Sequence, residues 1–403
     1  MVAQSARNLP DDTASLRLPT SWAGLDIDVG VPIEVLEAEW RALEAHRTAS
    51  VFQSWSLALA WTTHAAAARQ ERPLIVTGRE RGRLRMILPL GLVRQGGVDV
   101  VQWLAQSHAN YGMGLFDPAL LERIEAGDTD QLIIAIAKQV GAGVVHLDRQ
   151  PARWAGHANP FAASPCARRS ANDTFVVALA ADFAGQYARL FPKRALQPLK
   201  RRKRRLEEMG ALSFTCPRET EAKQKAFRWF VARKREQLAE TSGSNPFDEP
   251  GILPFYEALL AEDDLFEIDQ VLVGTQRAAL GMTLYGGGVA YGVNTAHVAQ
   301  FSRGSPGTLL QHHIIAKVHA RGARAYDLGP GFLPYKMEWA PDVVPLLATS
   351  HAVGLRGVPM QVRLVIETLA KAQIKRSPRL SALRRWLGRM LSSMRGGAPA
   401  EQA

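Results

Sequence analysis

The chain alternates between stretches in which apolar residues recur every three or four positions and shorter stretches in which they are continuous or alternate. The first pattern is typical of amphipathic helices and the second of strands. In the first half, helices are predicted to begin at Pro32 and Ser54, because each precedes apolar residues at helical spacing. The remaining elements of this half are strands over 74–77, 84–93 and 98–104, a helix over 118–140 and a strand over 144–147.

The second half repeats this order. Its predicted elements are helices over 219–240 and 253–260, strands over 266–273, 279–285 and 289–294, a helix after Thr308 and a strand ending at Tyr326 and Asp327. Each half thus reads helix, helix, three strands, helix, strand, which indicates two related domains. The predicted fold class is α/β (α+β), with a mixed, mainly antiparallel sheet flanked by helices in each half. The predicted divisions are a flexible N-terminus over 1–20, domains over 21–172 and 173–352, and a basic amphipathic helical tail over 353–403.

A glycine-rich turn precedes the helix of the second half. Thr308 is predicted to be its N-cap, and Gly322 is predicted to end it in a left-handed conformation. Gly304 and Gly307 allow close approach of backbone to a ligand, and the free amides of a helix start suit a pyrophosphate. The alternative is an ordinary strand-to-helix turn. The turn is neither a Walker loop nor a dinucleotide fingerprint, since no Gly-Lys-Ser/Thr and no G-x-G-x-x-G is present.

The composition indicates where the protein is located and which kinds of site it lacks. The apolar content of 47% and the charged content of 22% are those of a soluble globular protein, and no apolar run is long enough to span a membrane. The first 19 residues lack an apolar signal region, so we expect a cytoplasmic protein. The two cysteines, Cys166 and Cys216, are far apart, and neither a disulfide framework nor a metal site is predicted.

The net charge of +11 is concentrated in two places. Lys200 to Arg205 supplies six positive charges in sequence, and the stretch from Lys371 to Arg395 contains no acid. The tail pattern suits a helix on an anionic membrane surface or, as the alternative, one docked on the protein. The six-residue run is a solvated helix face, a contact for RNA phosphates, or a contact for an anionic donor or acceptor.

Three motifs resemble the CelD/BcsL-type acetyltransferase family, within the GNAT superfamily and its FemABX-like double arrangement. They are the basic run ending in Leu206-Glu207-Glu208-x-Gly210, Ser305-Pro306-Gly307 heading a helix, and Asp327-x-Gly329-x-Gly331 followed by Pro334-Tyr335-Lys336. Phe52-Gln53-Ser54-Trp55 and Leu88-Pro89-Leu90 fit the same family. The resemblance spans roughly Phe52 to Trp339 and implies two tandem GNAT-like domains, with the active site in the second. One departure is Pro306 in the donor loop, which removes an amide.

The resemblance implies transfer of an acyl group from acyl-CoA, most simply acetyl-CoA, which is a co-substrate rather than a tightly bound cofactor. The acceptor is an amine or hydroxyl on a glycan, nucleotide-sugar or lipid-linked precursor of the cell envelope or of a cellulose-type exopolysaccharide. The predicted donor-binding residues are Asn294, Arg303, Gly304, Ser305, Gly307 and Thr308. The predicted acceptor-binding residues are Arg202, Arg205 and Glu338.

Three residues are predicted to carry the chemistry. Asp327 ends a buried strand, where desolvation raises a carboxyl pKa toward that of a general base, although it can equally cap the following turn. Tyr335 is placed to protonate the leaving thiolate, and Lys336 to bind a phosphate or carboxylate. Two alternatives stay open, namely an aminoacyl-tRNA-dependent transferase acting on a peptidoglycan precursor and a non-catalytic accessory protein of polysaccharide synthesis. Aromatic residues do not interleave the basic run, which makes tRNA the weaker partner.

Overall fold

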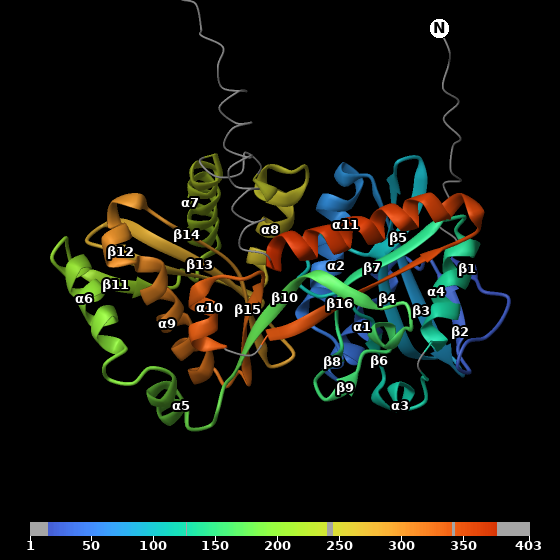
Figure 1. Ribbon diagram of the computed structural model, residues 1–403, viewed down its shortest axis with the longest axis horizontal. Helices are drawn as coiled ribbons and strands as arrows, with labels where there is room; N and C mark the ends of the chain where they lie inside the picture. Colours follow the sequence, from blue (N-terminus) through green and yellow to red (C-terminus); the bar gives the residue numbers. More distant parts are fainter. Residues whose placement is uncertain (1–14, 126, 240–244, 341–342, 377–403) are drawn as a thin grey trace, which may run out of the picture.

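The computed structural model describes residues 15–125, 127–239, 245–340 and 343–376. One continuous sheet runs through both halves in the order β1-β2-β3-β4-β5-β7-β16-β10-β15-β14-β13-β12-β11 (Figure 1). Its strands are β1 (Leu16–Arg17), β2 (Asp26–Val29), β3 (Glu71–Glu80), β4 (Arg83–Gln95), β5 (Val98–Trp103), β7 (Val144–Pro151), β10 (Arg168–Ala178), β11 (Leu212–Thr215), β12 (Phe266–Val273), β13 (Gln276–Gly286), β14 (Val289–His297), β15 (Ala325–Pro330) and β16 (Val343–Ala352). The short strand β6 (Leu115–Phe116) pairs with β4, and β8 (Arg153–Trp154) forms a hairpin with β9 (His157–Ala158).

Helices pack on the faces of this sheet. Those of the first half are α1 (Glu37–Glu44), α2 (Trp55–Trp61), α3 (Pro118–Leu121) and α4 (Asp128–Gln139). The second half contains α5 (Phe183–Leu190), α6 (Leu196–Glu207), α7 (Thr220–Ala239), α8 (Ile252–Ala261), α9 (Pro306–Ala320) and α10 (Pro334–Trp339), and α11 (Val358–Arg376) follows the last strand. Among the described residues, no helix combines the length and the apolar character that crossing a membrane requires.

The sheet of the second half has an apolar core on each face. Leu280 and Met282 of β13 belong to the core that contains residues of α7 and α8, whereas Ala279 belongs to the core that contains α9. Alternate residues of a strand point to opposite faces, so one strand supplies both cores. The helices of this half therefore lie on both sides of its strands, and α9 and α7 flank β14 from opposite faces.

The two halves have the predicted order of helix, helix, three strands, helix, strand, and the tandem α/β architecture is confirmed. Each half also contains one parallel pair of strands, β5 with β7 and β14 with β15. The final strand of each half is exchanged. β10 follows the first half in the chain but pairs with β15, and β16 follows the second half but pairs with β7, while β10 and β16 pair with each other.

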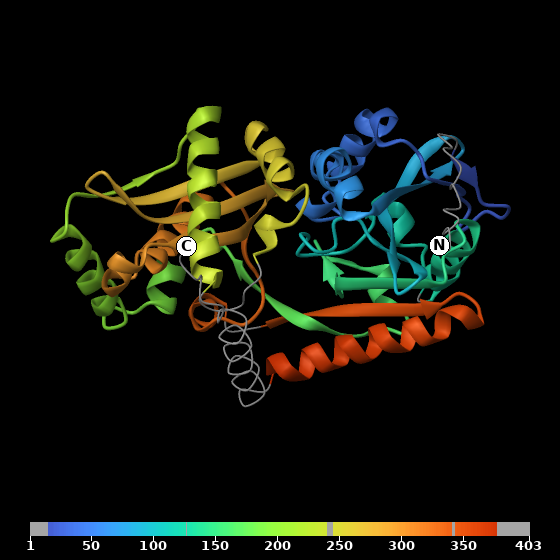
Figure 2. The same cartoon turned by 90° about the horizontal axis from the view of Figure 1, so that it is seen from above.

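The exchanged strands connect the two predicted domains, and their division at residues 172 and 352 stays a prediction. β16 lies within the predicted second domain, yet it extends the sheet of the first half. α11 lies along the outside of that half (Figure 2), where its Met360 and Leu364 pack on Val100 and Val144. An apolar strand pattern gives no information on which neighbour the strand pairs with, so sequence reasoning could not place β16. The apolar positions predicted for the tail helix, 380–394, lie outside the described residues.

The start of α9 also differs from prediction. The helix begins at Pro306, and Ser305 occupies the N-cap position with a φ of 45°, so Thr308 lies within the first turn. Proline suits the first helical position because its fixed φ is helical and its missing amide has no partner there. The predicted C-terminal glycine is confirmed, since Gly322 follows the helix with a φ of +79°.

Candidate active site

The two parallel strands β14 and β15 separate partway along their length. Among the described residues they pair from Val289 opposite Ala325 to Tyr291 opposite Asp327 and then diverge. In the same region the β13–β14 register shifts, so that Val293 is an extra residue in β14. Backbone groups at such a separation lose their ladder partners and become available to a ligand.

A cavity of about 310 Å³ occupies this separation. Its lining residues include the segment of β14 from Gly292 to Thr295, and Gln311 of α9. Two of the lining residues have a buried amide nitrogen without a well-aligned hydrogen bond among the described residues, Nε2 of Gln311, which lies near the Tyr326 hydroxyl, and Nδ2 of Asn110. Gln311 is only 6% exposed, and buried donors without partners are rare in folded proteins. The cavity therefore fits a ligand with hydrogen-bond acceptors, as the amide-rich arm of an acyl-CoA has.

One face of α9 leads from the solvent to this cavity. Gly307, Gln311 and Ile314 are spaced four and three residues apart and so share a helix face, and the latter two line the cavity. Open space surrounds the Cα of Gly307, and its amide makes no hydrogen bond to backbone within the part of the chain described. The start of α9 thus offers a donor and room for an anion at the outer end of the same face.

The basic helix α6 packs directly against this helix start. Leu206 fills the space beside Gly304, where an added Cβ would lie 2.3 Å from the leucine Cδ2. Arg205 donates from Nη1 to the carbonyl oxygen of Arg303 at 3.2 Å. Burial, and then the charge of Arg202, lowers the pKa of His312 on α9 to about 4. Two of the predicted acceptor-binding arginines therefore lie at the predicted donor loop.

The predicted donor-binding residues are only partly brought together. Asn294 lines the cavity, and Ser305, Gly307 and Thr308 are half-buried at the start of α9. Arg303 is exposed. Gly304 is buried against Leu206, so its Cα faces protein, and the glycine is needed for helix packing.

Asp327 lies beneath the cavity and does not line it. Its side chain is fully buried and accepts hydrogen bonds from the hydroxyl of Tyr111, from Oγ1 of Thr174 at 3.3 Å and from the amide of Gly329 at 2.5 Å. Burial raises its pKa to about 6, although these hydrogen bonds and the charge of Lys336 act in the opposite direction. The bond to Gly329 is the turn-capping arrangement, so the geometry favours positioning over direct contact with an acceptor.

The turn after β15 is held from its other side by Lys336. Its Nζ donates to the carbonyl oxygens of Gly329 at 2.9 Å and Pro330 at 3.2 Å, and burial lowers its pKa to about 8. Tyr335 lines the cavity, and burial raises the pKa of its hydroxyl. Glu338 is exposed and does not line the cavity.

A second cavity of about 150 Å³ adjoins the first, and the two share Asn110, Val293 and Asn294. It lies between the two halves of the chain, and aromatic side chains from both halves line it. His108 and Tyr256 face each other there, with His108 Nδ1 at 3.3 Å from the tyrosine hydroxyl. Burial lowers the pKa of His108 to about 4, so the ring is neutral at pH 7.

Sequence reasoning missed several polar residues of these cavities, among them His108, Asn110, Lys234 and Gln311. Gln311 was detectable, because it stands one helical turn after Gly307. His108 and Asn110 come from the other half of the chain, and no local pattern connects them to β14. Lys234 lies on α7 and lines the first cavity, and burial lowers its pKa to about 8.

The parallel strand pair of the first half, β5 with β7, differs from β14 with β15. β5 and β7 pair at Val100 opposite Val144 and at Val101 opposite Val145. Two residues further along β5, the fully buried Trp103 packs edge-to-face on Phe161, with ring centroids 5.3 Å apart. The second residue beyond the paired stretch of β5 is thus a tryptophan buried in the apolar core, whereas the same position in β14 is Val293, which lines the cavity.

Replacement of Asp327 tests the buried network. A folded pKa of about 6 against an ordinary value of 3.8 means that the folded protein holds a proton more tightly than the unfolded chain. The resulting stabilisation is full below pH 4 and is lost as the pH rises through 6. Between pH 5 and pH 8, the wild type should therefore lose about 1–1.5 kcal/mol of unfolding free energy that Asp327→Asn does not lose. Urea denaturation at the two pH values measures this difference, and parallel pH dependences would contradict it.

Comparison with known proteins agrees with this geometry. Residues 193–337 match the family model described as an acetyltransferase (GNAT) domain. No curated protein sequence matches the chain. The resemblance to the CelD/BcsL-type family stays a prediction.

Solved structures share the fold across most of the chain. FemX aligns with a TM-score of 0.54 and 11% identity over 82% of this chain and 98% of its own. The C-terminal domain of a proposed lysylphosphatidylglycerol synthetase from Agrobacterium fabrum aligns with a TM-score of 0.51 and 11% identity, over 85% of this chain and 97% of its own. A conserved protein of unknown function from Bacteroides thetaiotaomicron gives 0.51 and 9%, over 78% and 97%. Residues 193–337 therefore match a GNAT acetyltransferase domain, and this match supports acyltransferase activity.

Proposed function

We propose that the chain transfers an acyl group, most simply acetyl, from acyl-CoA to an amine or hydroxyl of a cell-envelope or exopolysaccharide precursor. The observation that carries the proposal is the cavity at the separation of β14 and β15, whose lining residues include the buried Gln311 of α9. The donor supplies an acyl group activated as a thioester. The start of α9, with Arg202 and Arg205 of α6, binds its phosphates, and the face of α9 from Gly307 to Ile314 directs its arm into the cavity.

The backbone from Gly292 to Asn294 is placed to polarise the thioester carbonyl. Amides freed from a sheet ladder are fixed in position and stabilise a developing negative charge on oxygen without reorganising. Asp327 and Lys336 hold the turn after β15 and so keep the cavity open. Tyr335, which lines the cavity, is the proposed proton donor to the leaving thiolate.

The acceptor is proposed to enter through the second cavity, because that cavity shares Val293 and Asn294 with the first. Lys234 is the proposed base. It lines the first cavity, it makes no ion pair among the described residues, and its lowered pKa of about 8 leaves a neutral fraction at physiological pH. A base with a pKa near the working pH is the most effective.

Binding of acyl-CoA tests the donor site. Gln311→Leu keeps the size of the side chain but removes the amide, and Arg202→Glu reverses a charge beside the helix start. Each variant should weaken acetyl-CoA binding about five- to tenfold, as expected for the loss of one or two hydrogen bonds or of a charge contact. Isothermal titration calorimetry measures the affinity, and release of free CoA in the presence of candidate acceptors measures turnover.

Matched variants separate this effect from general damage. Gln361 bonds the carbonyl of Ser350 at 2.9 Å, far from the cavity, and Arg201 is exposed on the same helix as Arg202. Gln361→Leu and Arg201→Glu should bind acetyl-CoA as the wild type does. Saturable binding to none of several acyl-CoAs would refute the proposal.

The pH dependence of turnover tests Lys234. If its neutral form takes the acceptor proton, kcat/KM should fall about tenfold per unit as the pH drops below 8. Lys234→Met should lower kcat by about 100-fold or more and abolish this limb, whereas Lys225→Met, an exposed lysine of the same helix, should change neither. If kcat/KM of Lys234→Met still fell in the same way below pH 8, the base would be a residue other than Lys234.

A membrane location is proposed from α11. Large apolar side chains are exposed along one line of this helix, Val358 (42%), Val362 (48%), Ile366 (59%) and Leu369 (48%), and Leu355 just before it is 90% exposed. Arg363 and Lys371 are exposed on the same helix, where both pair with Glu367, and the sequence after Lys371 contains no acid up to Arg395. Apolar and cationic residues on one surface suit an anionic lipid surface, where envelope precursors are found.

Vesicle sedimentation tests this location. The double variant Val362→Asn/Ile366→Asn should bind vesicles of anionic phospholipid several-fold more weakly than the wild type, because it removes two apolar contacts. Val35 is 71% exposed on the first half of the chain, so Val35→Asn serves as the control and should bind normally. Equal binding by all three proteins, or no preference for anionic over zwitterionic vesicles, would exclude α11 as the contact.

A second candidate function is transfer of an aminoacyl group from charged tRNA. The basic helix α6 favours it, since among the described residues only Lys203 of the run from 200 to 205 pairs with a carboxylate, Glu207 at 2.9 Å. A steep salt dependence of tRNA binding, together with no acyl-CoA binding, would favour this function over the first.

A further inference from the structure

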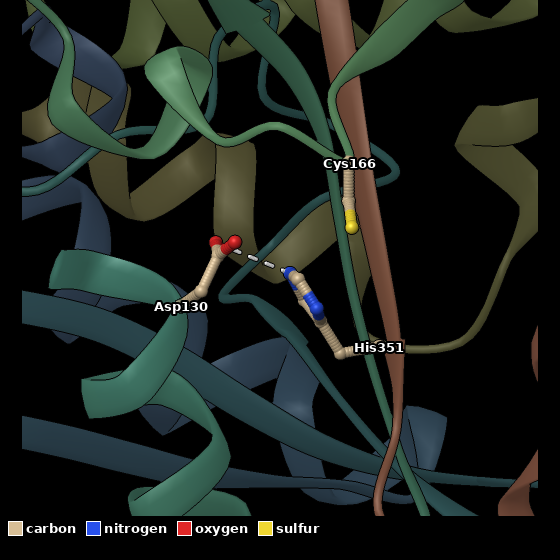
Figure 3. Close-up of side chains that lie close together, drawn as sticks. All are labelled: Asp130, Cys166 and His351. Atoms are coloured by element: carbon tan, nitrogen blue, oxygen red, sulfur yellow. Dashed lines mark ion pairs between the residues drawn. The ribbon is translucent and has the colours of Figure 1, made fainter. Parts of the chain in front are cut away.

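Three side chains that can ligate a metal meet on the first half of the molecule, away from both cavities. They are Asp130 of α4, Cys166 in the segment before β10, and His351 of β16, and their ligand atoms lie within 4.8 Å of one another. Figure 3 shows the carboxylate of Asp130 and the sulfur of Cys166 both turned toward the imidazole of His351. The three come from distant parts of the sequence, so spacing alone predicted no metal site.

The imidazole is buried and incompletely partnered. His351 is 8% exposed, and its Nε2 makes no hydrogen bond of acceptable geometry among the described residues, although it lies 3.3 Å from Oδ1 of Asp130. A buried ring nitrogen without a well-aligned hydrogen bond is an unsatisfied polar atom, which is rare in folded proteins. The distance between Nε2 of His351 and Oδ1 of Asp130 is also close to the distance between two ligand atoms of a tetrahedral zinc site, in which the bonds from zinc to nitrogen and oxygen are about 2.0–2.1 Å.

A serine holds the other two ligands in place. Ser164 is 6% exposed, and its hydroxyl donates to Oδ2 of Asp130 at 2.8 Å while accepting the amide of Cys166 at 3.1 Å. Supporting hydrogen bonds of this kind orient the ligands of metal sites. Cys166 is exposed on its loop, so a side-chain rotation can bring the sulfur to bonding distance.

We propose that Asp130, Cys166 and His351 bind one zinc ion. A thiolate and a carboxylate balance the charge of Zn²⁺, and sulfur, imidazole nitrogen and carboxylate oxygen are its preferred ligands. Binding deprotonates the thiol and releases one proton, and a water completes the tetrahedron. The ion would join α4, the segment leading to β10 and the exchanged strand β16, and so fasten β16 into the sheet of the first half.

Metal titration of the full-length protein tests the proposal directly, with no need for an acyltransferase assay. After chelator treatment, the wild type should bind one Co²⁺ with the absorption of a tetrahedral thiolate site, and Zn²⁺ should displace it. Zn²⁺ should also raise the melting temperature. Cys166→Ala should lower the affinity for Zn²⁺ by about 100-fold or more, and Ser164→Ala by about 10- to 100-fold.

Cysteine 216 supplies the matched control, because it is the other free cysteine and lies in the second half. Cys216→Ala should bind Co²⁺ and Zn²⁺ as the wild type does. Since Cys166 is exposed, Cys166→Ala should fold normally, which a thermal melt without metal confirms. Loss of the cobalt spectrum in Cys216→Ala, unchanged affinity in Cys166→Ala, or no binding by the wild type would each overturn the proposal.

Discussion

The candidate active site depends on the separation of two parallel strands. β14 and β15 pair as far as Tyr291 and Asp327, and beyond that point the space between them is open to a ligand. Paired strands do not separate without a cause, because each lost ladder bond leaves a donor and an acceptor to be satisfied. The causes here are the register shift at Val293 in β14 and the pairing of β15 with β10 on its other side.

The first half of the chain maintains this separation. Tyr111 and Thr174, which lie outside the hydrogen-bonded pair of strands, donate to the buried carboxylate of Asp327, and that carboxylate caps the turn at Gly329. The exchanged strands β10 and β16 connect the halves through one sheet. The tandem arrangement therefore gives two related units with different tasks. The first half buries Trp103 in its apolar core, and it supplies Asn110 and His108 to the cavities of the second half.

The fold was predictable because its signals are local. The apolar periodicity of each helix and strand, read in order, revealed both the repeated element order and the fold class. The glycine turn and the strand that contains Asp327 were also found locally, although that strand continues to Pro330, and they lie beside the cavity or directly under it. The features that the sequence did not predict depend on contacts between residues far apart in the chain. The exchange of β10 and β16, the burial of Asp327 under Tyr111, and the use of Gly304 to admit Leu206 all arise from partners remote in the chain. Nearness in sequence was also not sufficient. Glu338 lies two residues after Lys336, yet it is exposed and does not line the cavity.

The most direct test of the central claim is a crystal structure with a thioether analogue of acetyl-CoA, which cannot transfer its acyl group. The account predicts that the analogue's sulfur lies between β14 and β15, beside the backbone from Gly292 to Asn294, with its diphosphate at Gly307. A ligand bound in the first half near Trp103, or on the surface with β14 and β15 empty, would contradict it.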